Sequence, residues 1–288
     1  MIKLNGEKLN FGAYPNGETL ADGEQMLQLA GLGKQEPVQL ALHYDQDGDF
    51  MQLMFAKGYL ADHGFEAELT IAYMPYSRMD RVVGSSVFTL KYAAAFLNSL
   101  NFRSVTVVEP HSPVTLELLE RSRAVYPTLE LLDEVMQDIQ FQTDSDVLFF
   151  PDAGAQLRYG ELSGLRQLVG KKARDFQSGQ ISKLEVEGGD SLPLKQGFSA
   201  IIVDDLCSYG GTFLLSAERL KELGAGPIYL LVAHCERSIF KGKLLQSGLI
   251  KRVYATDSML SEADVEAGRQ ADVQTEFNLY PIGGMKHD

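Results

Sequence analysis

Cysteine is scarce in this chain of 288 residues, which carries only Cys207 and Cys235. Two cysteines in a chain of this length make neither a disulfide framework nor a metal-ligand set, so we expect a protein of the reducing cytoplasm. Positive charge is also in short supply, because 26 Lys and Arg stand against 39 Asp and Glu and give a net charge of −13. This excess of negative charge repels a phosphate backbone and excludes nucleic acid as the main partner.

Long apolar runs are absent as well. None approaches the about 20 residues that cross a membrane, and the first residues, MIKLNGEKLNFG, lack the apolar core of a signal peptide. The phosphate-binding patterns GxxxxGK[ST] and GxGxxG do not occur in the chain either. We therefore expect a cytoplasmic protein without a membrane partner, in which a nucleotide would have to be held by side chains.

Short apolar runs alternate with helical patterns along the whole chain, which is typical of βαβ units around a parallel sheet. The length and the pattern, which restarts near residue 145, predict an α/β protein of two domains, 1–145 and 146–288, each a mostly parallel sheet flanked by helices. The predicted strands are 38–43, 68–74, 104–109, 146–150, 199–203, 227–233 and 252–256, and the predicted helices are 47–64, 88–100 and 213–223. Residues 169–197 are polar and glycine-rich without a helical period, which indicates a hairpin or a mobile flap.

The most informative stretch is IIVDDLCSYGGTF, residues 201–213, in which a buried strand ends in Asp204 and Asp205 and a loop then opens onto a helix. Gly210 and Gly211 allow backbone N–H groups to converge on an anion, Thr212 adds a hydroxyl, and the helix dipole favours negative charge. Phosphate would repel the two carboxylates, so they suit sugar hydroxyls or Mg²⁺ instead. The stretch predicts a phosphate site with carboxylates beside it.

Three further groups suit phosphate chemistry. Arg78 follows a predicted strand and its guanidinium fork suits a polyphosphate, although a surface ion pair with Asp80 is the plainer reading. His111 follows the next predicted strand, where an imidazole could bind a metal or ATP, although a lone histidine is more often structural. Lys172 and Arg174 lie in the polar segment 169–197, where they are either a solvated basic run or cations that close over a transferring phosphoryl group.

The stretch at 201–213 resembles the phosphoribosyl-pyrophosphate signature of type I phosphoribosyltransferases, and the chain as a whole resembles the ribose-phosphate pyrophosphokinase (PRPP synthetase) family. Five further motifs occur in the order of that family. They are YPNGE at 14–18, YSRMDR at 76–81, EPHSPV at 109–114, PDAGA at 151–155 and KKAR at 171–174.

The resemblance implies two tandem phosphoribosyltransferase-like domains and a Mg²⁺-dependent transfer of the β,γ-diphosphate of ATP to the C1 hydroxyl of ribose 5-phosphate, giving PRPP and AMP. It implies ATP-binding roles for Tyr14, Asn16, Glu18, Arg78, Met79, Asp80 and His111. It implies ribose-phosphate binding by Asp152, Asp204, Asp205, Ser208, Tyr209, Gly210, Gly211 and Thr212. It implies catalytic roles for Lys172, Arg174, Arg78 and His111, and metal binding by His111 and Asp152. Because YPNGE matches a loop that contacts ATP of a neighbouring subunit, it also implies a homo-oligomer, a dimer or a hexamer.

Four positions depart from the family pattern. The phosphate loop usually reads Asp-Thr-x-Gly-Thr, whereas here Ser208 and Tyr209 replace an acidic residue and a small hydroxyl. An aromatic ring at 209 could stack on a nucleobase, which raises ADP-ribose as an alternative acceptor, giving ADP-ribose 1-pyrophosphate for NAD salvage. Met79 and Asn16 replace Gln and Asp on the ATP side.

Two other functions remain open at this point. The loop alone also fits a phosphoribosyltransferase that consumes PRPP, but the motifs of the first half argue against it. A non-catalytic regulatory paralogue would not need Lys172 and Arg174.

Overall fold

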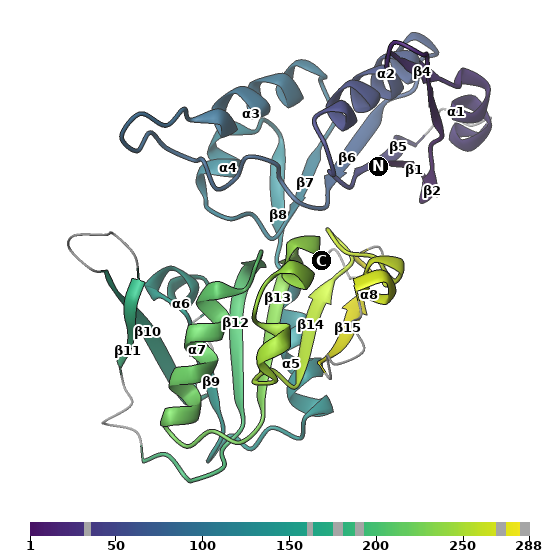
Figure 1. Ribbon diagram of the computed structural model, residues 1–288. Coiled ribbons are helices and arrows are strands. Elements are labelled where there is room, and N and C mark those ends of the chain that lie inside the picture. The colour runs from purple at the N-terminus through teal and green to yellow at the C-terminus, as the bar shows by residue number, and fades with distance from the viewer. Residues whose placement is uncertain (32–35, 160–163, 175–180, 188–192, 269–274, 283–288) are drawn as a thin grey trace. The chain divides into compact units, whose positions relative to one another are not determined.

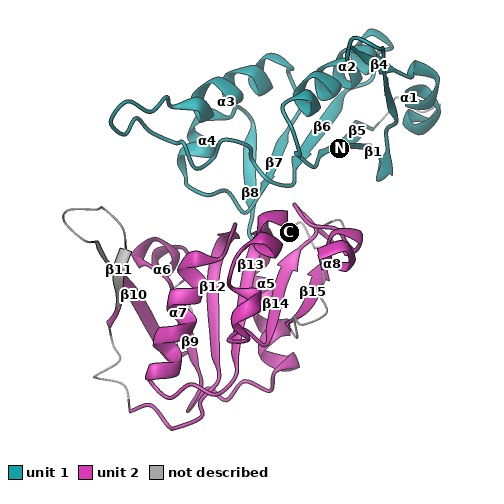
Figure 2. Ribbon diagram, viewed as in Figure 1, with its two compact units in different colours: residues 1–126, 283–288 teal, residues 127–282 magenta. Residues whose placement is uncertain are grey.

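Two units, each built around its own sheet, make up the described part of the chain in the computed structural model (Figure 1). The structure describes residues 1–31, 36–159, 164–174, 181–187, 193–268 and 275–282. Of these, residues 1–126 form unit 1 and residues 127–282 form unit 2 (Figure 2). Both units are α/β, which confirms the predicted fold class, and helix α5 (Pro127–Asp138) belongs to unit 2, ahead of the boundary expected near residue 145.

Unit 1 has a six-stranded sheet in the order β2-β1-β5-β6-β7-β8. Strands β5 to β8 run parallel, and β1 and β2 add an antiparallel edge. The strands are β1 (Ile2–Leu4), β2 (Glu7–Lys8), β5 (Val38–Leu42), β6 (Ala67–Ile71), β7 (Val105–Val108) and β8 (Ser122–Val125). The helices are α1 (Gly23–Ala30), α2 (Gly48–Asp62), α3 (Thr89–Ser99) and α4 (Val114–Leu118). A separate hairpin, β3 (Phe11–Ala13) with β4 (Thr19–Ala21), contacts α2 through β4.

The core of unit 1 follows from the periods read in the sequence. Along α2, Leu53, Ala56 and Leu60 recur at helical spacing and are fully buried. They pack against alternate residues of the parallel strands, such as Leu40 and Ile71. Burial of a leucine or isoleucine side chain contributes about 1.5–3 kcal/mol when it leaves water, so this layer stabilises unit 1.

Unit 2 has a seven-stranded sheet in the order β11-β10-β9-β12-β13-β14-β15. All neighbours are parallel except β10 and β11, which form the antiparallel hairpin expected in segment 169–197. The strands are β9 (Val147–Phe150), β10 (Gln167–Arg174), β11 (Ile181–Glu187), β12 (Ala200–Cys207), β13 (Ile228–Cys235), β14 (Arg252–Thr256) and β15 (Glu276–Tyr280). The helices are α5, α6 (Ala153–Tyr159), α7 (Gly211–Glu222) and α8 (Glu262–Gly268), with 3₁₀ turns η1 (Arg237–Lys241) and η2 (Leu245–Ser247).

Helices cover both faces of this second sheet. In Figure 1 α7 lies in front of the strands and α5 behind them, and both helices contact β13. The central strands β12 and β13 are therefore buried on both sides, which explains their continuous apolar sequences. Among the described residues, no helix is both long enough and apolar enough to cross a membrane.

Candidate active site residues

The acid pair lies at the carboxyl end of β12, where ligands of open parallel sheets bind. Asp205 is buried, and the Arg158 guanidinium on α6 lies 3.0 Å from its carboxylate. The Asp204 carboxylate accepts a hydrogen bond of 2.9 Å from the backbone N–H of Asp205. Burial and the neighbouring charge of Asp205 raise the pKa of the Asp204 carboxyl well above its usual range. The two carboxyls therefore differ, because Asp205 has a cation beside it and Asp204 tends to keep its proton.

The loop after β12 leads directly into α7. Gly210 begins the helix with φ of +80°, a conformation that favours glycine, and a Cβ there would also lie 2.8 Å from Leu244. No side chain of the described residues caps this helix, so the N–H groups of its first turn are available to an anion. Thr212 lies in that turn, and Tyr209 exposes 59% of its surface just before it. The structure thus brings Asp204, Asp205 and the predicted phosphate loop together.

Glu236 is a neighbour of this loop that the sequence did not reveal. Its carboxylate accepts hydrogen bonds from the hydroxyls of Ser208, at 2.6 Å, and Ser238, at 2.9 Å. Its backbone N–H donates to the carbonyl of Cys207 at 2.8 Å. Only the register of β12 against β13, which pairs Cys207 with Cys235, would have placed Glu236 beside Ser208.

Asp152, predicted to lie near ribose and metal, follows β9 and begins α6. One of its carboxylate oxygens accepts backbone N–H bonds of 3.1 Å from Gly154 and from Ala155. Its charge also contributes to the raised pKa of Asp204, which places the two carboxyls in the same neighbourhood. In the described part of the chain, no three side chains of His, Cys, Asp or Glu are grouped so that they could hold a metal ion by themselves.

Lys172 and Arg174 lie on β10, opposite Leu184 and Ile181 of β11 in the strand register. The register shifts between Ala173 and Arg174, which marks a bulge or irregularity at this end of the hairpin. The side chains of Lys172 and Arg174 lie outside the described part of the structure. The proposed role of these two cations therefore rests on the sequence.

On unit 1, Arg78 and His111 follow neighbouring parallel strands, β6 and β7, and so lie at the same edge of that sheet. Arg78 is exposed in the segment between β6 and α3, whereas His111 is half-buried. Asp80 lies in an ion pair with Arg81, at 3.7 Å. Met79 is exposed by 41% and its sulfur accepts a hydrogen bond from Thr89.

The tip of the β3–β4 hairpin carries the three other residues expected to contact ATP. The side-chain oxygen of Asn16 accepts a hydrogen bond of 3.2 Å from the N–H of Glu18, and the N–H of Tyr14 donates to the carbonyl of Glu18. Asn16 therefore shapes the turn itself. Tyr14 is exposed by 52% at this tip.

A cluster of two tyrosines and one aspartate beside Arg78 was missed by sequence reasoning. The Asp47 carboxylate accepts hydrogen bonds from the hydroxyls of Tyr44, at 2.5 Å, and Tyr76. These two bonds hold the pKa of Asp47 below its usual value, and the bond to Asp47 raises the pKa of Tyr76. Tyr76 also has φ of +64°, which is rare for a residue with a side chain. The hydrogen bonds of this cluster hold in place the start of the segment that carries Arg78.

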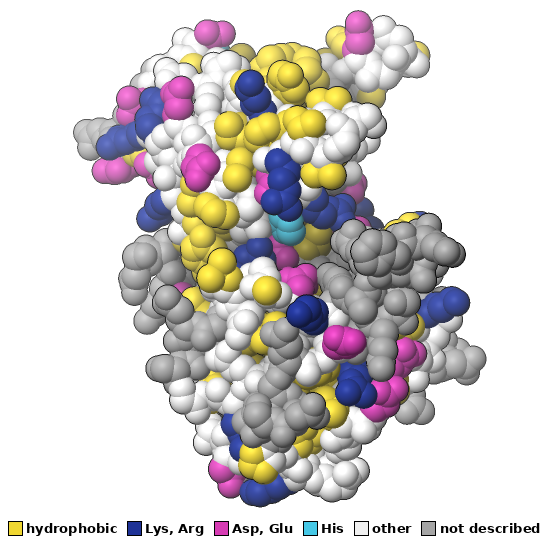
Figure 3. Space-filling model, turned by 90° about the vertical axis from the view of Figure 1, so that its left-hand side faces the viewer, with side chains coloured by type: hydrophobic (Ala, Val, Ile, Leu, Met, Phe, Trp, Pro, Cys, Tyr) yellow, Lys and Arg dark blue, Asp and Glu magenta, His cyan; other side chains and the backbone are white. Residues whose placement is uncertain are grey.

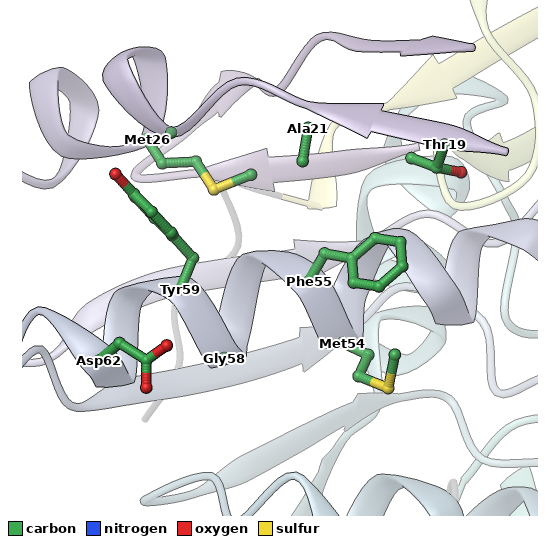
Figure 4. A pocket seen from close by; sticks show the side chains of 9 residues that line it. Thr19, Ala21, Met26, Met54, Phe55, Gly58, Tyr59 and Asp62 are labelled. Atoms are coloured by element: carbon green, nitrogen blue, oxygen red, sulfur yellow. The ribbon is translucent and has the colours of Figure 1, made fainter. Parts of the chain in front are cut away.

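A pocket of about 460 Å³ opens on unit 1 between β4, α1 and α2 (Figure 4). Its walls are mainly apolar, with Met26 and Tyr59 pointing into it, Met54 and Phe55 also lining it, and Asp62 at one end. None of the residues predicted to bind ATP or ribose phosphate lines it.

Comparison with known proteins shows what the chain is similar to. No model of a known protein family matches it. The ribose-phosphate pyrophosphokinase of Thermococcus kodakarensis is 27% identical over 214 residues, which are 74% of this chain and 74% of the relative. The enzyme of the same name from Methanothermobacter thermautotrophicus is 28% identical over 224 residues, 76% of this chain and 75% of the relative. The chain is similar to ribose-phosphate pyrophosphokinases over about three quarters of its length.

The fold agrees with this relationship. A crystal structure of phosphoribosylpyrophosphate synthetase from Mycobacterium smegmatis superposes with a TM-score of 0.71 at 16% identity, covering 96% of this chain and 86% of that one. A match along both units confirms that a ribose-phosphate pyrophosphokinase-like fold was correctly predicted from the motifs.

Proposed function

We propose that the chain is a diphosphotransferase that moves the β,γ-diphosphate of ATP to the C1 hydroxyl of ribose 5-phosphate and releases AMP. The observation that carries the proposal is the end of β12, where two carboxylates precede an uncapped helix N-terminus, in a chain similar to ribose-phosphate pyrophosphokinases. The C1 hydroxyl attacks the β-phosphorus and AMP leaves. The protein contributes alignment and charge stabilisation rather than covalent chemistry.

Unit 2 is proposed to hold the sugar phosphate. The N–H groups of the first turn of α7 and the Thr212 hydroxyl bind the 5-phosphate, and Gly210 and Gly211 allow it to approach the backbone. Asp204 and Asp205 bind the ribose hydroxyls, where a protonated Asp204 can donate a hydrogen bond and Asp205 has the Arg158 guanidinium beside it. Lys172 and Arg174 on the β10–β11 hairpin neutralise the charge that develops on the transferring group.

Unit 1 is proposed to hold ATP. Arg78 and His111, at one edge of the sheet, bind the phosphates, with Met79 and Asp80 beside Arg78 in the same segment. The hairpin tip contributes its own set to adenine recognition, namely Tyr14, Asn16 and Glu18.

Mg²⁺ fits the carboxylates of unit 2 by donor chemistry. Mg²⁺ prefers oxygen ligands and usually takes only one or two carboxylates together with substrate phosphates. Asp152 would provide such oxygens, and its carboxylate suits the ion better than the imidazole nitrogen of His111 does. When bound, the ion supplies neutralisation of the diphosphate charge.

We further propose that the chain forms a homo-oligomer in the cytoplasm. Hydrophobic side chains gather over the unit 1 part of the surface in Figure 3. Several such residues of unit 1 are more than half exposed, namely Tyr14, Val82, Val83, Val87 and Tyr92. Apolar surface of this kind marks association sites. Sedimentation checks the proposal, since a monomer that is fully active at high dilution contradicts it.

Ribose 5-phosphate is the acceptor that the relatives' name indicates, and no relative reported above supports ADP-ribose. The experiment incubates the full chain with Mg-ATP and either ribose 5-phosphate or ADP-ribose, and resolves AMP and the sugar product by mass. We expect AMP and a sugar 1-diphosphate with ribose 5-phosphate. AMP with neither acceptor contradicts the proposed function, and product only with ADP-ribose assigns the alternative acceptor.

A further inference from the structure

The loop between β12 and α7, residues 208–210, rests on a segment that begins directly after β13. At Gly242 an added Cβ would lie 1.9 Å from the carbonyl oxygen of Tyr209, so the two backbones are in direct contact. At Gly210 an added Cβ would lie 2.8 Å from the Leu244 side chain. Together with the hydrogen bond from Glu236 N–H to Cys207, these contacts hold the loop along its length.

The polar contacts between the loop and this segment are hydrogen bonds from two hydroxyls to one carboxylate. Glu236 accepts from Ser208 at 2.6 Å and from Ser238 at 2.9 Å, and the two hydroxyl oxygens are 3.1 Å apart. A serine hydroxyl has one proton, and a carboxylate has none to give. The proton of Ser208 therefore points at Glu236 and is not available to a phosphate oxygen.

We propose that Glu236 is a positioning residue that fixes the phosphate loop through Ser208, and that Ser208 does not itself donate to the bound phosphate. The anion is then held by the backbone N–H groups at the start of α7 and by Thr212. The Glu236 carboxylate comes from the residue that follows the neighbouring strand, β13. The loop itself contains no acidic residue between Cys207 and Thr212. The inference rests on the proposed function for the identity of the sugar phosphate, but the anion site itself does not require it.

The two possible roles of Ser208 predict opposite results when Glu236 is removed. If Ser208 only anchors the loop, Glu236→Ala and Ser208→Ala weaken phosphate binding by a similar factor, about tenfold for a hydrogen bond to a charged group. The double variant is then no weaker than either single variant. If Ser208 donates to the phosphate, Glu236→Ala frees its proton and tightens binding, and Ser208→Ala weakens binding in both backgrounds.

The experiment measures binding of inorganic phosphate and of ribose 5-phosphate to the full chain by calorimetry, for the single and double variants. Ser238→Ala is the matched control, because it removes a hydrogen bond to the same carboxylate and leaves the bond from Ser208 to Glu236 in place, and we expect less than a threefold change. Ser208→Thr keeps the hydroxyl and should bind both probes as the wild-type chain does. Thermal unfolding of each variant separates loss of the loop geometry from loss of the fold.

Steady-state kinetics add a second readout. We expect KM for ribose 5-phosphate to rise about tenfold in Ser208→Ala while KM for ATP stays within a factor of two, a split that general destabilisation would not produce. Tighter phosphate binding in Glu236→Ala or Glu236→Gln overturns the proposal, as does a wild-type chain that binds neither probe. Binding that follows the expected pattern in a chain that never releases AMP preserves the positioning role and contradicts the proposed function instead.

Discussion

The two units place their candidate ligand groups on loops of opposite character. In unit 2 the loop 208–210 is three residues long and touches Glu236, Gly242 and Leu244. In unit 1 the segment from β6 to α3, residues 72–88, is long, and Val82, Val83 and Val87 in it are more than half exposed. One loop presents backbone N–H groups held in place by its neighbours, whereas the other exposes side chains to solvent. We expect changes on unit 2 to act mainly on rate and sugar phosphate, and changes on unit 1 mainly on ATP affinity.

The largest effect should come from the cations of the β10–β11 hairpin. Lys172→Ala and Arg174→Ala each remove a positive charge proposed to stabilise the transferring diphosphate, so we expect kcat to fall on the order of 10²–10³-fold with small changes in either KM. Lys171→Ala, on the same strand and exposed, is the control and should leave kcat within a factor of two. AMP release under saturating substrates is the measurement. Equal losses in all three variants would contradict a specific role for Lys172 and Arg174.

Asp204→Asn tests whether the Asp204 carboxyl lowers the stability of the folded chain at neutral pH while it is needed for activity. The pKa of Asp204 is raised in the folded chain, so between the usual value and the raised value the unfolded chain releases a proton that the folded chain keeps. The contribution of this carboxyl to stability is therefore full at low pH and falls as the pH rises through that window. We expect the ligand-free Asn variant to match wild type near pH 4 and to unfold at higher temperature near pH 7, by roughly 2–4 °C for each kcal/mol of difference.

The same variant should lose most of its activity, since Asn cannot reproduce both protonation states of the carboxyl toward the ribose hydroxyls. Thermal scans across pH, together with AMP release, check both parts. A variant less stable than wild type at every pH would contradict the raised pKa.

The sequence predicted the local geometry at the end of β12, but not the contacts that come from neighbouring strands. Asp204, Asp205 and the start of α7 are neighbours in the chain, so one strand, one turn and one helix fix their relation. Local rules of strand, glycine and helix terminus were enough there. Glu236 was missed because its place beside Ser208 depends on which strand lies next to β12, which no local pattern reveals.

The first unit illustrates the same limit. The cluster of Tyr44, Asp47 and Tyr76 joins the loops after β5 and β6, so it exists only once those strands are paired. The edge strands β1 and β2 and the hairpin β3–β4 are two or three residues long, too short for an alternating pattern to be recognised. Helix α5 was not anticipated either, although its buried Leu131, Leu132 and Val135 follow helical spacing.

Arg78→Ala tests whether unit 1 binds ATP and not the sugar phosphate. Removing the guanidinium fork from an exposed segment should raise KM for ATP about tenfold, the value of one charge-assisted contact, with KM for ribose 5-phosphate unchanged. Arg81→Ala is the matched control, because Arg81 lies three residues on and pairs with Asp80 while 79% exposed. Initial rates with each substrate varied in turn give both constants. An effect on ribose 5-phosphate instead of ATP would reverse the assignment of the two units.

The smallest effect is expected from Asp47→Asn, which weakens the anchor of the Arg78 segment without touching a ligand. Hydrogen bonds from Tyr44 and Tyr76 lower the pKa of Asp47, so its stabilising contribution is present above the usual carboxyl pKa and is lost as the pH falls through the lowered value. We expect wild type to exceed the variant in Tm by about 1–2 °C near neutral pH, the size of one net hydrogen bond. That difference should close toward pH 3.

KM for ATP should rise by a factor of about two to three, because Tyr76 precedes Arg78 by two residues and orders the start of its segment. Tyr76→Phe removes the hydroxyl at the other end of the same bond and should reproduce the change in KM. If both variants leave KM for ATP unaltered while Arg78→Ala raises it, ATP alone orders the segment, and the two units differ even more than their loops indicate.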